Sequence, residues 1–216
     1  MDRSDPHPLR SVLLDAVAGR FPAPDGGVEL LAPDAAGTCA VVELTGHSYI
    51  LTDLPASAFD GLGVDGFGGA TNPAVLLRLA GERRSVGALD VVLARHATPG
   101  PARLAPLDDV DDHPRVLRAR RHRSDVRVIG DDRGVVCVGR GLVGRLEISV
   151  ELTGAAAGSG AGRDLVTAGL AGLPDGEPVF AQVSPGNAAS LRTFLACGFV
   201  PIGSEVLIAD AHTEFR

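Results

Sequence analysis

The sequence contains no tryptophan, a single tyrosine and no lysine, so its basic side chains are all arginines. Aromatic residues make up only 4 % of the 216 residues, and a core must therefore be built from valine, leucine, alanine and isoleucine. The absence of lysine excludes a Walker phosphate loop, which requires Gly-Lys-Ser/Thr. Arginine in place of lysine, with abundant alanine and glycine, is typical of GC-rich coding and predicts a bacterial origin.

The chain also has few cysteines, and its net charge is negative. The three cysteines are odd in number and widely spaced, which predicts neither a disulfide framework nor a metal site. A net charge of −7 argues against nucleic acid as a partner, because such binding depends on neutralising phosphates. No apolar run has the length of a membrane span, and residues 1–10 lack the apolar core of a signal peptide. These absences predict a cytoplasmic protein without a membrane partner.

The pattern along the chain predicts two parts. Residues 1–87 contain a helix over 9–19, strands and a second helix over 73–80, with Asn72 as its N-cap. This part is expected to be an α/β lobe that is either a degenerate copy of the second part or an extra layer beside an acceptor pocket. Residues 88–216 form the second predicted domain.

The second part alternates strands and helices. Strands are expected over 88–97, 125–130, 134–142, 144–152, 179–183 and 200–208. Helices are expected after the glycines near residue 160 and after Asn187. This order predicts an α/β fold with a mixed, mostly antiparallel twisted sheet flanked by helices.

Three alternating glycines, Gly158, Gly160 and Gly162, stand between a predicted strand and a predicted helix. At these glycines the GxGxxG dinucleotide fingerprint is excluded, because its third glycine would fall on Arg163 or Leu165. A GxGxxG match does occur at residues 61–66, but no predicted strand precedes it, so it does not indicate a dinucleotide site. Glycine lets a backbone approach a ligand closely, and the first amides of a helix favour an anion. The loop is therefore either a phosphate-binding cradle or a slack connection, and the segment alone leaves both open.

The downstream segment adds a strand, then Asn187, then a helix that ends at Gly198 and Phe199. Together with the G-x-G-x-G loop, this order resembles the GNAT family of acetyl-CoA-dependent N-acetyltransferases. The resemblance runs from about Glu147 to Phe199, and the preceding strands extend it back toward Ala88. It implies a GNAT-like acyl-CoA transferase fold, with acetyl-CoA as the cofactor.

The resemblance also implies roles for individual residues. The CoA pyrophosphate is expected on the backbone amides of Gly158, Ser159, Gly160, Ala161, Gly162 and Arg163. The pantetheine arm is expected along Val150, Glu151 and Leu152, with the amide of Val150 polarising the acetyl carbonyl. Asn187 and Ser190 are expected to contact CoA, and helix capping by Asn187 is compatible with that contact.

A protonated amine needs a base before it can attack. Glu147 is the first candidate, because it lies on the strand before the loop at a position that is often acidic in the family. An ion pair to Arg140 or Arg145 is the competing interpretation. Glu151 is the second candidate for the base. Asp125, His122 and His113 are weaker candidates.

Two positions depart from the family pattern. Ala157 stands where the loop usually begins with arginine or glutamine. Phe194 stands where many members have the tyrosine that protonates the CoA thiolate. The sequence therefore predicts an N-acetyltransferase acting on a primary amine, and leaves open a non-catalytic CoA-binding or protein-interaction module.

Other features leave more than one interpretation open. The amine acceptor, a small molecule or a peptide, is not specified, and a homodimer is compatible with the sequence. Six arginines between residues 115 and 127 follow four aspartates. This arrangement favours a solvated helix with complementary ends over a site for an acidic acceptor.

Overall fold

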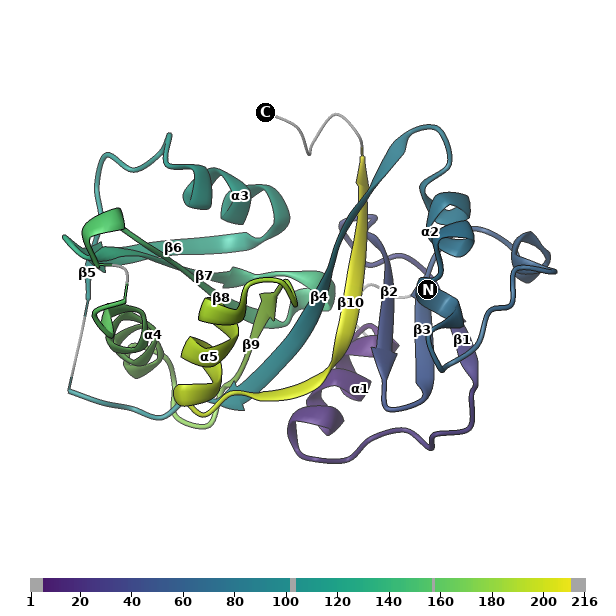
Figure 1. Cartoon of the computed structure of the whole chain (residues 1–216), viewed down its shortest axis with the longest axis horizontal. Coiled ribbons are helices and arrows are strands. Elements are labelled where there is room, and N and C mark those ends of the chain that lie inside the picture. The colour runs from purple at the N-terminus through teal and green to yellow at the C-terminus, as the bar shows by residue number, and fades with distance from the viewer. Residues whose placement is uncertain (1–5, 102–103, 157, 211–216) are drawn as a thin grey trace. The chain divides into compact units, whose positions relative to one another are not determined.

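The computed structural model describes residues 6–101, 104–156 and 158–210. The chain divides into two compact units (Figure 1). Unit 1 comprises the residues up to Val92 together with those from Ile202 onward, and unit 2 comprises Leu93–Pro201. Unit 1 is therefore built from two separate stretches of the sequence.

The described residues of unit 1 contain two α-helices, α1 (Pro8–Val17) and α2 (Pro73–Ala80). Its strands are β1 (Val28–Leu31), β2 (Cys39–Leu44), β3 (His47–Leu51), most of β4 (Arg84–His96) and most of β10 (Val200–Asp210). Their order is β1-β3-β2-β10-β4. The β1–β3 pair is parallel, whereas β2 pairs antiparallel with β3 and with β10.

The last strand in the described part of the chain, β10, belongs mostly to unit 1. β10 pairs with β2 over five residues, from Ser204 opposite Glu43 to Ile208 opposite Cys39. Val206 and Ile208 are buried in the same core cluster as α2. The predicted assignment of residues 88–216 to one domain therefore differs from the observed units, because the pairing partner of β10 lies far away in sequence.

Unit 2 contains the helices α3 (Pro114–His122), α4 (Ala161–Ala171) and α5 (Ala188–Ala196). Its further strands are β5 (Ala105–Pro106), β6 (Ser124–Asp131), β7 (Gly134–Arg140), β8 (Leu146–Leu152) and β9 (Pro178–Val183). Together with the end of β4 they follow the order β4-β9-β8-β7-β6-β5. The β5–β6, β6–β7 and β7–β8 pairs are antiparallel and the β8–β9 pair is parallel. This is the mixed, mostly antiparallel sheet with flanking helices that the sequence predicts.

Opposite faces of the unit 2 sheet carry different helices. Val116 and Ala119 of α3 share a buried cluster with Val135 and Cys137 of β7. On the other face, Gly169 of α4 lies against β7 and β8, since a Cβ added there would be 3.0 Å from Val136 and 3.2 Å from Ile148. Alternate residues of a strand point to opposite faces. The odd-numbered residues of β8 from Glu147 onward therefore lie beneath α3.

Local signals set several element boundaries as predicted. α2 spans Pro73–Ala80, and the Asn72 side chain accepts a 3.1 Å hydrogen bond from the Val75 amide as its N-cap. Gly81 follows with φ +56°, a conformation that favours glycine. β6 and β7 close a tight hairpin in which Asp131 pairs with Gly134.

Candidate active site

The central strands β8 and β9 separate after a short parallel ladder, which consists of Leu146↔Val179 and Glu147↔Phe180. β8 continues to Leu152 and β9 continues to Val183. Beyond these two pairs, the backbone N–H and C=O groups with which β8 and β9 face each other can form hydrogen bonds with an additional extended segment. This separation lies where the GNAT resemblance places the pantetheine arm, along Val150 to Leu152.

The loop between β8 and α4 has two left-handed glycines. Gly158 has φ +79° and Gly160 has φ +90°. A Cβ added to either would meet no atom within 4 Å, so the loop opens to solvent instead of packing against the protein. These positions need glycine because of their backbone angles and not for lack of space.

The amides of this loop divide into two groups. Those of Arg163 and Asp164 donate to the Gly160 carbonyl at 3.0 and 3.3 Å and thus close the first turn of α4. The amides of Gly158, Gly160 and Gly162 donate to no other residue in the described parts of the chain. Three N–H groups at alternate positions beside a helix N-terminus form a cradle suited to an anion. Because the Arg163 amide is used within the first turn of α4, any contact of Arg163 with the anion would come from its exposed side chain.

Other loop residues hold this conformation. The Ser159 hydroxyl donates a 2.7 Å hydrogen bond to the Ala156 carbonyl, and the Ala161 amide lies 3.4 Å from the same hydroxyl. A Cβ at Gly162 would lie 3.3 Å from Thr193, so glycine lets α4 approach α5 closely. Ala157, where the family has arginine or glutamine, lies outside the described residues.

Asn187 is the N-cap of α5. Its side-chain oxygen accepts a 3.1 Å hydrogen bond from the Ser190 amide, and this confirms the capping role predicted for it. Ser190 thus uses its amide within the helix, while both residues keep polar side-chain groups at the helix start. At the other end of α5, Phe194 is buried and makes an edge-to-face contact with Phe199, with ring centroids 5.1 Å apart.

Glu147 lies in a buried ion-pair cluster. Its Oε1 accepts a hydrogen bond from Arg145 Nε and its Oε2 accepts one from Arg123 Nε, both at 2.8 Å. The side chains of Glu147, Arg123 and Arg145 are only 7, 10 and 1 % exposed. The sequence predicts an ion pair of Glu147 with Arg140 or Arg145, and the pair with Arg145 is confirmed. Arg140 instead donates to the Gly144 carbonyl.

The charges around Glu147 determine its protonation. Burial raises the pKa of this carboxyl, but the opposing attraction and hydrogen bonds of Arg145 and Arg123 outweigh burial and hold the pKa below its usual value. A carboxylate with a lowered pKa is a weaker proton acceptor. The role of Glu147 as a general base stays a prediction, and its two guanidinium partners weigh against it.

Gly139 near the end of β7 and Gly141 just after β7 leave room for the ion-pair cluster around Glu147. A Cβ at Gly141 would overlap the Glu147 carboxylate. A Cβ at Gly139 would lie 3.2 Å from the Cβ of Arg123 and 2.9 Å from the Ser124 carbonyl. The cluster therefore depends on small residues of β7 and of the connection that follows it.

Arg123 bridges the two separating strands on the α3 face. Besides Glu147, it donates to the Ser149 hydroxyl of β8 at 3.0 Å and lies 3.5 Å from the Gln182 amide oxygen of β9. Ser149 and Gln182 each lie two residues beyond the last pair of the β8–β9 ladder. The sequence did not single out Arg123, because it is one of six arginines in a polar run.

Glu151 is the more accessible of the two candidate bases. Its side chain is 41 % exposed and forms a 3.1 Å ion pair with Arg115 of α3. It lies one residue beyond Val150, the predicted oxyanion donor. Arg115 in the first turn of α3 thus pairs with Glu151, and Arg123, directly after α3, pairs with Glu147.

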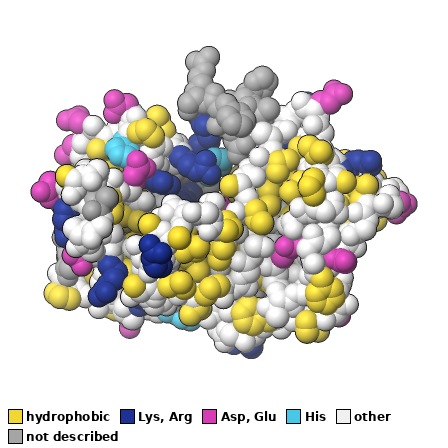
Figure 2. Space-filling model, in the orientation of Figure 1, with side chains coloured by type: hydrophobic (Ala, Val, Ile, Leu, Met, Phe, Trp, Pro, Cys, Tyr) yellow, Lys and Arg dark blue, Asp and Glu magenta, His cyan; other side chains and the backbone are white. Residues whose placement is uncertain are grey.

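The arginines between residues 115 and 127 fit the interpretation as a solvated helix only in part. Arg120 pairs with Asp111 at 2.6 Å, as expected for a helix with acidic residues before it. Arg123 and Arg115 instead reach under the helix to β8. Figure 2 shows basic side chains gathered where α3 lies.

Of the weaker candidates, His113 has a structural role and Asp125 lies at the surface, whereas His122 is the half-buried last residue of α3. The His113 ring accepts a 3.1 Å hydrogen bond from the Arg115 amide and caps α3. Asp125 is exposed. Within the described residues, no group of three or more histidine, cysteine, aspartate or glutamate side chains could hold a metal ion, and no helix is long and apolar enough to cross a membrane.

Comparison with known proteins gives structural likenesses only. No protein-family model matches the sequence, and no curated protein matches it significantly. One similar solved structure, from Novosphingobium aromaticivorans, is described as an acetyltransferase of the GNAT family; it has 18 % identity and a TM-score of 0.40, with 60 % of this chain and 69 % of that chain covered. A GCN5-related N-acetyltransferase from Kribbella flavida has 17 % identity and a TM-score of 0.38, with 65 % of each chain covered.

A functionally unknown protein from Staphylococcus epidermidis has 12 % identity and a TM-score of 0.41, with 64 % of this chain and 68 % of that chain covered. Likenesses at these scores carry no functional argument. The fold follows instead from the separation of β8 and β9, the open glycine loop at the start of α4, and the capped helix α5 after β9. By this arrangement, the chain has the GNAT-like fold that its sequence resembles.

Proposed function

We propose that this protein is an acetyl-CoA-dependent N-acetyltransferase that acts on a primary amine. The observation that carries the proposal is the set of three glycine amides without partners in the described chain, which follows directly on the separation of β8 from β9. An anion at a helix N-terminus gains about 0.3–1 kcal/mol from the helix dipole, and hydrogen bonds from the loop amides add to it. The cradle thus fits a pyrophosphate, and the open edge of β8 fits an extended arm.

When bound, acetyl-CoA supplies an acetyl group activated as a thioester. The amide of Val150 is proposed to donate to the thioester carbonyl, where negative charge develops as the amine attacks. Glu151 is proposed to take the proton that the amine releases as a C–N bond forms and a C–S bond breaks. It is favoured over Glu147 because it is more exposed and has one guanidinium partner instead of two.

The thiolate is proposed to leave unprotonated, or to take its proton from water or from a residue other than Phe194. Phe194 has no hydroxyl, and its ring is buried against Phe199. An unperturbed thiol has a pKa near 8.5, so release as a thiolate is energetically accessible near neutral pH. The aromatic ring thus serves the packing of α5, whereas the tyrosine of related enzymes serves proton transfer.

A second candidate function is a CoA-binding module without catalysis. The observation that favours it is the pairing of both candidate bases with arginines, Glu151 with Arg115 of α3 and Glu147 with Arg123, which follows α3. Both functions predict CoA binding, and only the enzyme predicts release of free thiol in the presence of an amine.

Calorimetric titration with acetyl-CoA tests binding, and thiol release across a panel of amines tests turnover. Gly160→Ala should weaken acetyl-CoA binding by about tenfold or more, because alanine at φ +90° distorts the cradle. Gly176→Ala is the matched control, since Gly176 has φ +73° and open space but lies in the loop before β9.

The possible results separate the hypotheses. Equal loss of binding in both variants would show general destabilisation and contradict the cradle. Absence of acetyl-CoA binding by the wild-type protein would overturn both functions. Binding without thiol release for any amine would favour the non-catalytic module.

A further inference from the structure

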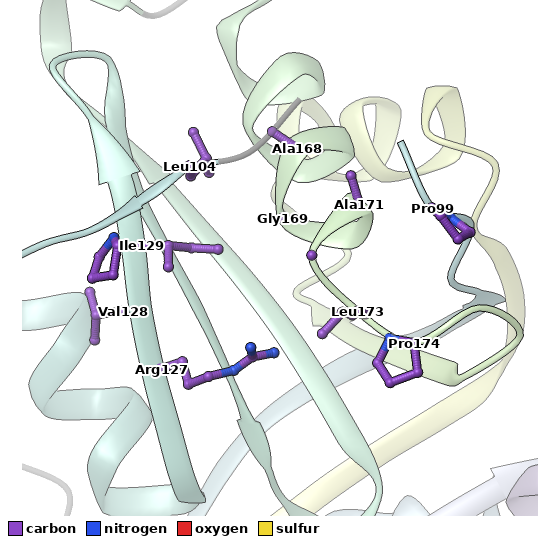
Figure 3. A pocket seen from close by; sticks show the side chains of 12 residues that line it. Pro99, Leu104, Arg127, Val128, Ile129, Ala168, Gly169, Ala171, Leu173 and Pro174 are labelled. Carbon is purple, nitrogen blue, oxygen red and sulfur yellow. The ribbon is translucent and has the colours of Figure 1, made fainter. Parts of the chain in front are cut away.

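A hollow of about 920 Å³ lies in unit 2 on the sheet face opposite α3. Its floor is β6, where Arg127 and Ile129 alternate with Val126 and Val128. The two valines pack in the α3 cluster, so Arg127 and Ile129 point to the other face. Figure 3 shows both side chains directed toward α4 and the segment after it. The hollow is thus separate from the glycine loop, which lies at the opposite end of α4.

The hollow exists because α4 does not extend over β6. Gly169 packs on β7 and β8, which leaves this face of β6 uncovered by α4. The side chains of α4 toward the hollow are small, namely Ala168 and Ala171, and Leu173 follows at its rim. No aromatic side chain lines the hollow among the described residues, so its surface is aliphatic.

Arg127 is the one charged residue among the described residues that line this hollow. Within the described parts of the chain it has no carboxylate within ion-pair distance. A neighbouring hollow of about 340 Å³ shares Arg127 and also contains Asp125, Arg140 and Glu177, so opposite charges balance there. Among the described residues no acidic side chain lines the larger hollow, so the carboxylates nearest to Arg127 in the lining lists belong to the smaller hollow.

We propose that the larger hollow binds an aliphatic carboxylate, with the carboxylate on Arg127 and the aliphatic body against Ile129, Ala168 and Leu173. Arginine holds a carboxylate through two parallel hydrogen bonds, which fixes the orientation of such a ligand. Burial of the aliphatic body supplies affinity in proportion to the apolar area removed from water. The volume lies within the usual range of small-molecule sites, about 300–1,000 Å³. The proposal does not depend on acetyl transfer.

The test is a titration of isotope-labelled protein with octanoate and with 1-octanol, followed by NMR of the methyl groups. For a ligand of this size we expect affinities on the order of millimolar. Octanoate should shift the methyl signals of Ile129 and Leu173 without shifting those of Val116, which is buried in the α3 cluster on the opposite face. Arg127→Gln should weaken octanoate binding about three- to tenfold and leave binding of 1-octanol unchanged.

Arg118→Gln is the matched control, because Arg118 is an exposed arginine of α3 on the opposite face. It should bind octanoate like the wild type. Ala171→Leu should weaken both ligands by filling the hollow. The proposal is overturned if octanoate leaves these methyl signals unmoved, if both arginine variants bind it alike, or if acetyl-CoA displaces it.

Discussion

Arg123 and Glu147 form a 2.8 Å ion pair in which both side chains are nearly inaccessible to solvent. Arg123 follows α3, and Glu147 lies at the last paired position of β8 before it separates from β9. The pair therefore ties the helix over the sheet to the point where the strands part. Its removal should affect both stability and the geometry of the proposed site.

Glu147→Gln should destabilise unit 2 by about 3–5 kcal/mol, because it leaves two buried guanidinium groups without their charge partner. Urea unfolding at neutral pH measures this loss. Glu151→Gln is the control and should cost about 1 kcal/mol or less, since its ion pair is half-exposed. Similar losses in the two variants would contradict the buried cluster.

The stabilisation from Glu147 should depend on pH. Because its folded-state pKa lies below the ordinary value of 4.5, the unfolded chain binds the proton more readily. The contribution is therefore fully present above the unfolded-state pKa and is lost as the pH falls through the folded-state pKa. The stability difference between wild type and Glu147→Gln should narrow in that acidic range, and a difference that grows there would contradict the assignment.

Gly141→Ala should destabilise the protein by about 1–3 kcal/mol, because the added methyl group overlaps the Glu147 carboxylate. Thermal unfolding provides the measurement. Gly154→Ala is a suitable control, since a Cβ at Gly154 meets nothing within 4 Å. If Gly141→Ala were no worse than this control, the close approach of Gly141 to Glu147 would be wrong.

Asn187→Ala should cost about 1 kcal/mol of stability through loss of the α5 cap. Asn187→Ser should restore most of that stability, because serine is also a good N-cap. If Asn187 also contacts CoA, both variants should bind acetyl-CoA more weakly than the wild type. Full recovery of binding in the serine variant would leave Asn187 with a capping role alone.

Glu43→Gln tests a second half-buried carboxyl, in unit 1. Burial raises the pKa of Glu43, although Thr71 and Ser204 donate hydrogen bonds that partly oppose the shift. The charged form is therefore disfavoured in the folded state at neutral pH, and this cost disappears as the pH falls below the raised pKa. The variant should gain stability relative to wild type at pH 7 and lose that advantage in acid. Equal stability of the variant and the wild type at every pH would contradict the raised pKa of Glu43.

Local signals explain what the sequence predicts well. Asn72 and Gly81 bound α2 by capping and by left-handed geometry, and both act on neighbouring residues only. The glycines at 158 and 160 likewise reveal an unusual backbone within a few positions. Such features depend on short-range interactions that a single segment contains.

The features that the sequence does not predict depend on contacts between segments that are distant in the sequence. Arg123 resembles the arginines around it, and its burial is decided by the space that Gly139 leaves on β7. The pairing of β10 with β2 joins residues more than 150 positions apart. The hollow beside Arg127 exists because α4 covers β7 and β8 but not β6. None of these relationships leaves a periodic or compositional signal in the sequence.

The assignment of β10 to unit 1 has a consequence for synthesis on the ribosome. Domains generally fold as they emerge, beginning with the N-terminal one. Here the residues of unit 2 are continuous and nearly all are translated before β10, whereas the N-terminal sheet lacks its β10 neighbour until residues 202–210 emerge. The part of the chain made first would therefore be the last to complete its sheet, and a nascent chain stalled near residue 200 would expose the edge of β2.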